Sequence, residues 1–326
     1  MRILFQLSVV AFVFGFAGLE TFGSEDLEQE FREVAPVEWE KLQSFLGKVR
    51  GSAEQTQFHG EEKLSSRMIE FMVNGGSQRA VTTSPDSTDT RAFACCRSHL
   101  KNYSFSLSKD SPSEGFVVRA LDTYDPDISM FKYSSGHDGM YRSLQRFLNA
   151  PFVIEYYFLP MMHKSPGFKV LEVSAANERP DDLVEVRFEY ESPSPELKSS
   201  LKNGIAVFSR SNHWAMTSFS AEASWGGLSG EIEYEEDGAN GFRFPRSVHH
   251  KLWAGTPFKS ELHDNEAYKF VGLKTFEAPS EEFTLAAFGI AEVLNESGKK
   301  SYIPVLVAVL LCITLLTLIV RQKGQK

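Results

Sequence analysis

The chain has 326 residues and a formal net charge of -9. This length is enough for one large domain or two small ones. An acidic chain lacks the basic surface that nucleic acid binding requires, so no nucleic acid partner is expected. Phenylalanine occurs 27 times, and we expect most of these rings in a core, with a surplus suited to lining an apolar cavity.

Residues 1–23 have the pattern of a signal peptide. Arg2 supplies the charged start, an apolar run follows, and small residues such as Gly23 and Ser24 offer a cleavage point. The competing interpretation is an uncleaved signal anchor. Either way, we expect the residues that follow to be exported.

Residues 302–320 carry no charge and consist mainly of Leu, Val and Ile. As a helix this run spans roughly 30 Å, the hydrocarbon thickness of a bilayer. The pattern predicts a single C-terminal membrane span, preceded by a stem at 293–301 and followed by a cytoplasmic tail at 321–326. A buried core helix is the weaker alternative. The expected location is a single-pass membrane protein with a periplasmic or extracellular ectodomain.

A helical segment is predicted over 24–50. Its apolar residues, among them Phe31 and Trp39, recur at spacings of three and four, and Pro36 interrupts the pattern. We expect the apolar stripe to pack on a sheet. The alternative is a helix that binds a partner.

Strict alternation at 183–190 predicts a strand. Val184, Val186, Phe188 and Tyr190 alternate with charged residues, so all four fall on one face. One apolar face and one charged face are typical of antiparallel sheets.

The rest of 51–292 is predicted as one antiparallel β domain. Gly75-Gly76 and the stretch 237–241 are hairpin signals. A helical insertion is expected near 137–160, with the alternative that its apolar part, 152–158, forms a strand.

Cys95 and Cys96 are adjacent and are predicted to point to opposite faces of a strand. An ordinary structural disulfide between them is not expected, and we predict one buried thiol and one at least half-exposed thiol. A functional vicinal disulfide is the alternative, so the role of the pair stays open.

No constellation for chemistry emerges. His249 and His250 are adjacent, so on a strand they face opposite ways, and no metal-ligand spacing or nucleophile elbow occurs. We therefore predict no catalytic residue, no metal, no cofactor and no enzymatic activity. The acidic positions Glu231 and Glu233 indicate a solvated strand face, with a calcium site at the following hairpin as the alternative.

Four stretches carry a resemblance to a known family: Asn-Tyr-Ser-Phe-Ser-Leu at 102–107, the strand at 183–190, the hairpin at 230–245 and the closing segment at 282–289. Over about residues 37–292 the chain resembles the LolA/LppX half-barrel of lipoprotein carriers, and more specifically the LolA-like exported proteins of planctomycete bacteria. The resemblance implies a mainly β (α+β) fold: a curved antiparallel half-barrel sheet with an apolar concave face covered by helices.

Such a fold is expected to hold an apolar ligand. The candidate ligand-binding residues each lie in an alternating strand; they are Phe105, Val186, Phe188, Phe219 and Tyr234. The alternative for each is ordinary core packing. The predicted function is a membrane-anchored binding module for a lipid, an acyl chain or a lipidated partner; the alternative is a structural or sensory ectodomain without a ligand cavity. The predicted tether departs from the soluble carriers and favours a fixed module over a shuttle.

Overall fold

The structure is a computed structural model. It describes residues 24–84, 90–99, 101–123, 148–155, 157–177, 182–193, 200–236, 238, 241–254 and 262–292. The predicted signal peptide, the predicted span at 302–320 with its tail, and most of the predicted helical insertion lie outside these residues. Within the described part of the chain, no helix has the length and apolar character needed to cross a bilayer.

The chain divides into two compact units, Met1–Thr284 and Leu285–Lys326. The first unit holds the whole sheet. The described residues of the second form the short 3-10 helix η3 (Leu285–Phe288), where the backbone N–H of Ala286 donates to the Glu292 carboxylate.

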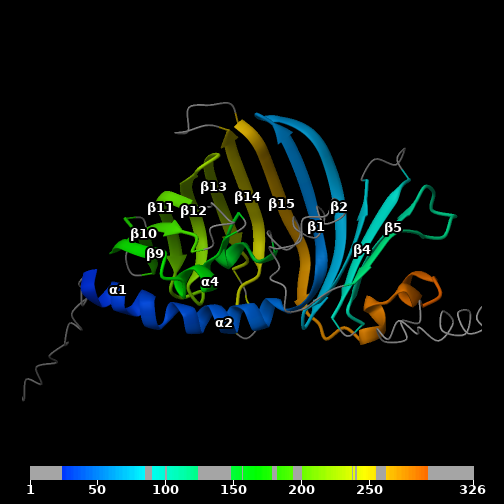
Figure 1. The fold of residues 1–326 in the computed structure, drawn as a ribbon, viewed down its shortest axis with the longest axis horizontal. Helices are drawn as coiled ribbons and strands as arrows, with labels where there is room; N and C mark the ends of the chain where they lie inside the picture. The colour runs from blue at the N-terminus through cyan, green and yellow to red at the C-terminus, as the bar shows by residue number, and fades with distance from the viewer. Residues whose placement is uncertain are drawn as a thin grey trace, which may run out of the picture. The chain divides into compact units, whose positions relative to one another are not determined.

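One antiparallel sheet of thirteen strands dominates the first unit and bends into an arch (Figure 1). Its strands are β1 (Lys48–His59), β2 (Glu62–Asn74), β3 (Ser77–Thr83), β4 (Ala92–Ser98), β5 (Tyr103–Lys109), β6 (Val117–Thr123), β9 (Phe168–Ala175), β10 (Leu183–Glu191), β11 (Ser200–Ser209), β12 (Ala215–Ala223), β13 (Gly226–Tyr234), β14 (Pro245–Ala254) and β15 (Leu262–Thr275). The prediction of a mainly β fold with a wide, curved antiparallel sheet is confirmed.

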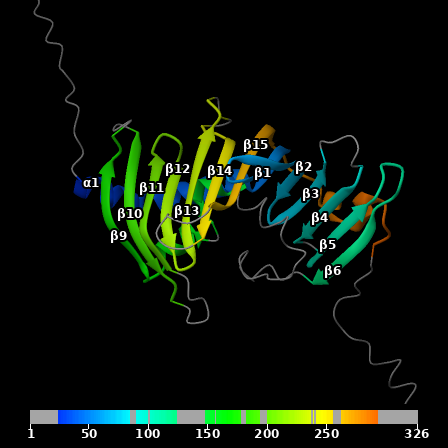
Figure 2. The same cartoon turned by 90° about the horizontal axis from the view of Figure 1, so that it is seen from above.

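The strand order is β6-β5-β4-β3-β2-β1-β15-β14-β13-β12-β11-β10-β9. Strands β1–β6 form one meander and strands β9–β15 form another, and the two meanders join where β1 pairs with β15. The sheet is therefore continuous from β6 at one edge to β9 at the other (Figure 2). The predicted β2–β3 hairpin is confirmed: Gly75 and Gly76 have φ of 52° and 90°, a left-handed turn that favours glycine.

Two helices lie under the arch at its open side: α1 (Ser24–Glu33) and α2 (Ala35–Leu46) (Figure 1). Pro36 sits in the first turn of α2, where a missing N–H does little harm. The predicted helical segment ends earlier than residue 50, because β1 begins at Lys48.

Strands β12 and β13 form a hairpin, joined by a turn at Ser224 and Trp225. Gly226 and Gly227, which follow the turn, begin β13. The closing apolar segment forms the 3-10 helix η2 (Ser280–Phe283) and then η3.

The described part of the insertion is a compact apolar unit. It comprises the 3-10 helix η1 (Ala150–Phe152), the two-residue strands β7 (Val153–Ile154) and β8 (Tyr157–Phe158), and the short helix α4 (Leu159–His163). The alternative of a strand at 152–158 is thus partly confirmed, since β7 and β8 pair as a small antiparallel hairpin.

Cross-strand register assigns each side chain to a face of the sheet. We call the face that carries Val186, Ala206 and Phe219, on the side of α2 and α4, the inner face, and the opposite face the outer face. Directly opposed residues in antiparallel strands point to the same side. By this rule Cys95, paired with Ala80, lies on the inner face.

Cys96 therefore lies on the outer face, so the prediction that the two cysteines point to opposite faces is confirmed. The prediction of one at least half-exposed thiol is wrong, because both cysteines are buried. The cause is η2, which contacts β3 and β4 and reaches the outer face through an ion pair between Arg79 and Glu282.

A candidate binding surface on the inner face

One row of side chains crosses the inner face from β9 to β2 and changes character midway. In cross-strand order the residues are Val173, Val186, Ala206, Phe219, Gly230, His250, Glu266, Gln57 and Ser65. The first five are apolar and the last four are polar. The inner face thus joins an apolar strip on β9–β13 to a polar strip on β14–β2.

The structure brings four of the five predicted ligand-binding residues onto the apolar strip. Val186, Phe188 and Phe219 are at most 5% exposed and belong to one hydrophobic cluster. Tyr234 packs against the same cluster half-buried, and its hydroxyl donates to the Met216 carbonyl at 2.6 Å.

Phe105 does not share this surface. It pairs with Cys96 on β4, and Cys96 pairs with Arg79 on β3, so register places Phe105 on the outer face. It is buried there beside Tyr103, with ring centroids 5.6 Å apart. The alternation predicted its strand correctly, but not the face to which the ring points.

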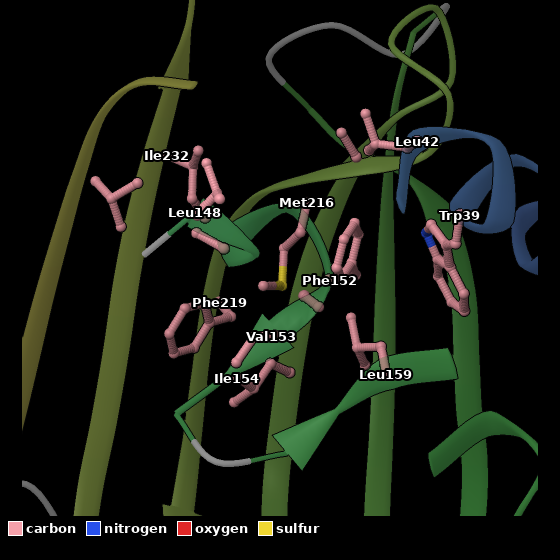
Figure 3. Close-up of a cluster of buried hydrophobic side chains, with 14 of the residues drawn as sticks. Trp39, Leu42, Leu148, Phe152, Val153, Ile154, Leu159, Met216, Phe219 and Ile232 are labelled. Carbon is pink, nitrogen blue, oxygen red and sulfur yellow. The ribbon is translucent and has the colours of Figure 1, made fainter. Parts of the chain in front are cut away.

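The chain's own insertion covers the apolar strip. Figure 3 shows Phe152, Val153 and Ile154 between β12, which carries Met216 and Phe219, and the helix that carries Trp39 and Leu42. All three insertion residues are at most 3% exposed and belong to the same cluster as the sheet residues. A continuous apolar segment is therefore already seated on the predicted binding surface.

A glycine makes room for the Phe219 ring. A Cβ at Gly230 would lie 2.3 Å from the Phe219 ring, closer than any real contact. The Phe219 side chain therefore lies flat across β13, and its ring centroid is 5.2 Å from that of His250. This contact is the boundary between the apolar strip and the polar strip.

The polar strip is a buried hydrogen-bonded cluster. The Glu266 carboxylate accepts from the side-chain amides of Gln55 at 3.2 Å and Gln57 at 2.9 Å, and Ser65 donates to Gln57 at 3.1 Å. Glu266 is only 5% exposed. Buried carboxylates are stable only when such donors replace water.

The insertion contributes the second acid of the cluster. Glu155 lies at the turn between β7 and β8 with φ of 54°, an unusual value for a residue with a side chain, and it is fully buried. Its carboxylate lies 3.3 Å from Nδ1 of His250, which neighbours Glu266 across the strands. The insertion is therefore fixed to the sheet by a polar contact as well as by apolar packing.

Sequence reasoning missed this polar cluster. It did separate His249 from His250 correctly: His250 lies on the inner face, whereas the His249 ring bonds to Asn265. The signal for Glu155 was present, since it is the one charge in the apolar run 152–159. Its partner, His250, is 95 positions away in the chain, and only the register of the strands brings the two residues together.

Helices α1 and α2 are fastened to the turn between β11 and β12. The Trp39 indole N–H donates to the Trp214 carbonyl at 2.7 Å, and Glu38 accepts from the His213 ring at 2.5 Å. Arg210 forms an ion pair with Glu30 of α1 at 2.9 Å. His213 and Trp214 have φ of 56° and 54°, so this turn holds two strained residues in place.

This fastening makes the stability of the fold depend on pH. Burial by itself raises the pKa of Glu38, but hydrogen bonds from Lys41 and His213 outweigh burial and hold the pKa below its usual value. A carboxylate whose pKa is lower in the folded state than in the unfolded state stabilises the fold. This stabilisation is complete at pH values above the unfolded-state pKa of about 4.3. The stabilisation is lost as the pH falls through the folded-state pKa.

We therefore expect the free energy of unfolding of the wild type to approach that of Glu38→Gln as the pH is lowered from about 6 to about 3. Urea titrations at stepped pH, followed by far-ultraviolet circular dichroism, measure the difference. Glu40→Gln is the matched control on the same helix, because it removes an exposed carboxylate and leaves the Glu38–His213 contact in place. Parallel pH curves for the wild type and Glu38→Gln would contradict the expectation.

Known proteins were compared with the chain by sequence and by structure. No family model and no curated protein matches the sequence. Among solved structures, the chain is similar to a domain described as an outer membrane lipoprotein-sorting protein from Vibrio parahaemolyticus, with 10% identity and a TM-score of 0.46, covering 78% of this chain and 97% of that one. It is also similar to a LolA superfamily protein from Nitrosomonas europaea, with 9% identity and a TM-score of 0.42, covering 78% and 99%.

The two neighbours are described as an outer membrane lipoprotein-sorting domain and a LolA superfamily protein. At these identities neither neighbour assigns a function or a site residue to this chain. The more specific resemblance to planctomycete proteins stays a prediction.

Proposed function

We propose that the chain is an exported, membrane-tethered binding module whose inner face holds one apolar ligand: a lipid, a free acyl chain or the acyl chain of a lipidated partner. The observation that carries the proposal is the seating of Phe152, Val153 and Ile154 on the apolar strip. A surface that accepts a continuous apolar segment of its own chain has the chemistry to accept an acyl chain in its place.

The free energy gained by burying an acyl chain is comparable to the free energy lost by exposing the insertion. Each methylene buried contributes about 0.8 kcal/mol, so an acyl chain gains on the order of 10 kcal/mol before ordering costs. Exposing three apolar side chains of the insertion costs about 1.5–3 kcal/mol each. A long acyl chain therefore offsets the displacement of the insertion, whereas a short one does not.

The location is part of the proposal. The predicted signal peptide and the predicted span at 302–320 support an exported domain held at a membrane. A tethered domain receives or presents its ligand locally, which separates its role from that of a soluble shuttle.

Native mass spectrometry of the full-length protein, released from membranes in mild detergent, tests the proposal. We expect a co-purifying lipid, or uptake of a fluorescent long-chain fatty acid after delipidation. Ala206→Leu fills the strip between Val186 and Phe219 and should abolish uptake, while Val207→Leu, its neighbour on the outer face, should not. A clean apo mass with no uptake would contradict the proposal.

A second candidate is a structural or sensory ectodomain without a ligand. The burial of Val186, Phe188 and Phe219 among the chain's own side chains favours it. In that case the fatty acid would fail to bind wild type, Ala206→Leu and Val207→Leu alike.

A further inference from the structure

A hollow on the outer face gathers three cations. It has a volume of about 250 Å³ and opens over β15, β1, β2 and β3. Register places Lys274, Arg50, Met72 and Arg79 in one cross-strand row, and all four line the hollow. Three cations in four successive positions are unusual in a chain whose net charge is -9.

Two of these cations face each other directly across neighbouring strands. Arg50 and Lys274 are directly opposed on β1 and β15, an arrangement that destabilises a sheet. Arg79 already forms an ion pair with Glu282. Within the described ranges, no carboxylate forms an ion pair with Arg50 or Lys274. Their mutual repulsion falls when an anion lies between them.

The backbone shapes the hollow around this pair. Gly272 and Leu273 on β15 stand opposite Gly51 alone on β1, a β-bulge in which Gly272 has φ of 62°. A Cβ at Gly272 would meet no atom within 4 Å, so the bulge leaves open space beside Lys274. Bulges of this kind re-aim neighbouring side chains and are frequent beside binding sites.

Arg50 is held in position. Its guanidinium lies over the Phe276 ring, 4.1 Å from the centroid, so less conformational freedom is lost when it binds an anion. Arginine offers a planar fork of donors that matches two oxygens of a phosphoryl group, and lysine adds a compact charge for a third. Glu70 also lines the hollow and can accept hydrogen bonds from hydroxyl groups of a phosphate ester.

We propose that this outer-face hollow binds a phosphoryl group, with Arg50 and Lys274 as its two anchors. The shared chemistry is a phosphate monoester or diester, supplied either by a lipid headgroup or by a soluble phosphate ester. The site is independent of the inner face, because it lies on the opposite side of the sheet.

Calorimetric titration of the full-length protein in uncharged detergent tests the site. One arm adds glycerol 3-phosphate, and a second adds micelles doped with phosphatidylglycerol, with diacylglycerol-doped micelles as the phosphate-free control. Arg50→Gln and Lys274→Gln should each raise the dissociation constant about tenfold or more, as expected for a lost charge-assisted hydrogen bond. Lys269→Gln, an exposed outer-face position on the same strand, is the matched control and should change it less than about twofold.

Binding of the soluble ester, lost in Arg50→Gln and Lys274→Gln, supports the proposal with a soluble source. Binding confined to phosphatidylglycerol micelles, with the same losses, supports it with a lipid source. Absence of binding in both arms would overturn it. An equal loss of binding in Lys269→Gln would also overturn the proposal, because it would show only a nonspecific attraction between opposite charges. Unchanged circular dichroism spectra establish that each variant is folded.

Discussion

Replacing Trp39 by alanine should lower the free energy of unfolding by about 3–5 kcal/mol, the range found when a large buried aromatic side chain is removed. Trp39 is fully buried between the helices and the sheet, and its ring lies 5.8 Å from those of Phe31 and Phe208. The substitution also leaves the buried Trp214 carbonyl without the indole donor.

Urea titration followed by far-ultraviolet circular dichroism measures this loss. Trp39→Phe should cost less, about 1–3 kcal/mol, because it retains most of the apolar contact and loses the hydrogen bond. Trp225→Ala is the control, since Trp225 is 43% exposed at the turn between β12 and β13; it should change stability by less than about 1 kcal/mol. A Trp39→Ala variant as stable as Trp225→Ala would refute the view that α2 is fixed to the sheet by this ring.

Replacing Glu155 by alanine should also lower the free energy of unfolding, by about 1–3 kcal/mol, because the substitution removes a polar partner of the buried His250 ring. Glu155 is fully buried and lies 3.3 Å from His250. Glu155→Gln should cost less, because an amide oxygen can still accept a hydrogen bond from the His250 ring. Glu231→Ala, an exposed acid of β13, is the control and should have little effect.

The Glu155 substitution should also change function. Because Glu155 belongs to the insertion and His250 to the sheet, losing their contact loosens the insertion from the inner face. Uptake of a fluorescent fatty acid by Glu155→Ala should therefore be faster than by the wild type, whereas Glu231→Ala should match the wild type. Equal uptake rates in all three proteins would contradict this prediction, because they would show that the contact between Glu155 and His250 does not control access of the fatty acid to the inner face.

Local sequence pattern predicted much of the sheet. Alternation placed β10 within one residue of its end, and the paired glycines located the β2–β3 hairpin. These features depend on neighbours along the chain, which a sequence displays directly.

Features that depend on distant segments were not predictable in the same way. A period of two groups Phe105 with Tyr103 and Leu107, but it does not say which face of the sheet they occupy. That choice depends on register across β4 and on η2, which covers the outer face of β3 and β4. In this part of the sheet both faces carry buried residues, so apolar character does not distinguish them.

The polar strip of the inner face shows the same limit. Glu155 and His250 meet because the β7–β8 turn places one acid against the middle of β14. Glu266 meets Gln57 because β1 and β15, the two ends of the sheet-forming chain, pair at its centre. No short motif encodes either contact.

Hydrogen exchange of the full-length protein, with and without a bound long-chain fatty acid, tests most directly whether the inner face exchanges its own insertion for an apolar ligand. On loading, backbone amides of 148–163 should exchange faster, because this segment leaves the sheet, while those of β10–β13 stay protected. Unchanged or slower exchange in 148–163 at saturating fatty acid would contradict the account, since the insertion would then be a permanent part of the core.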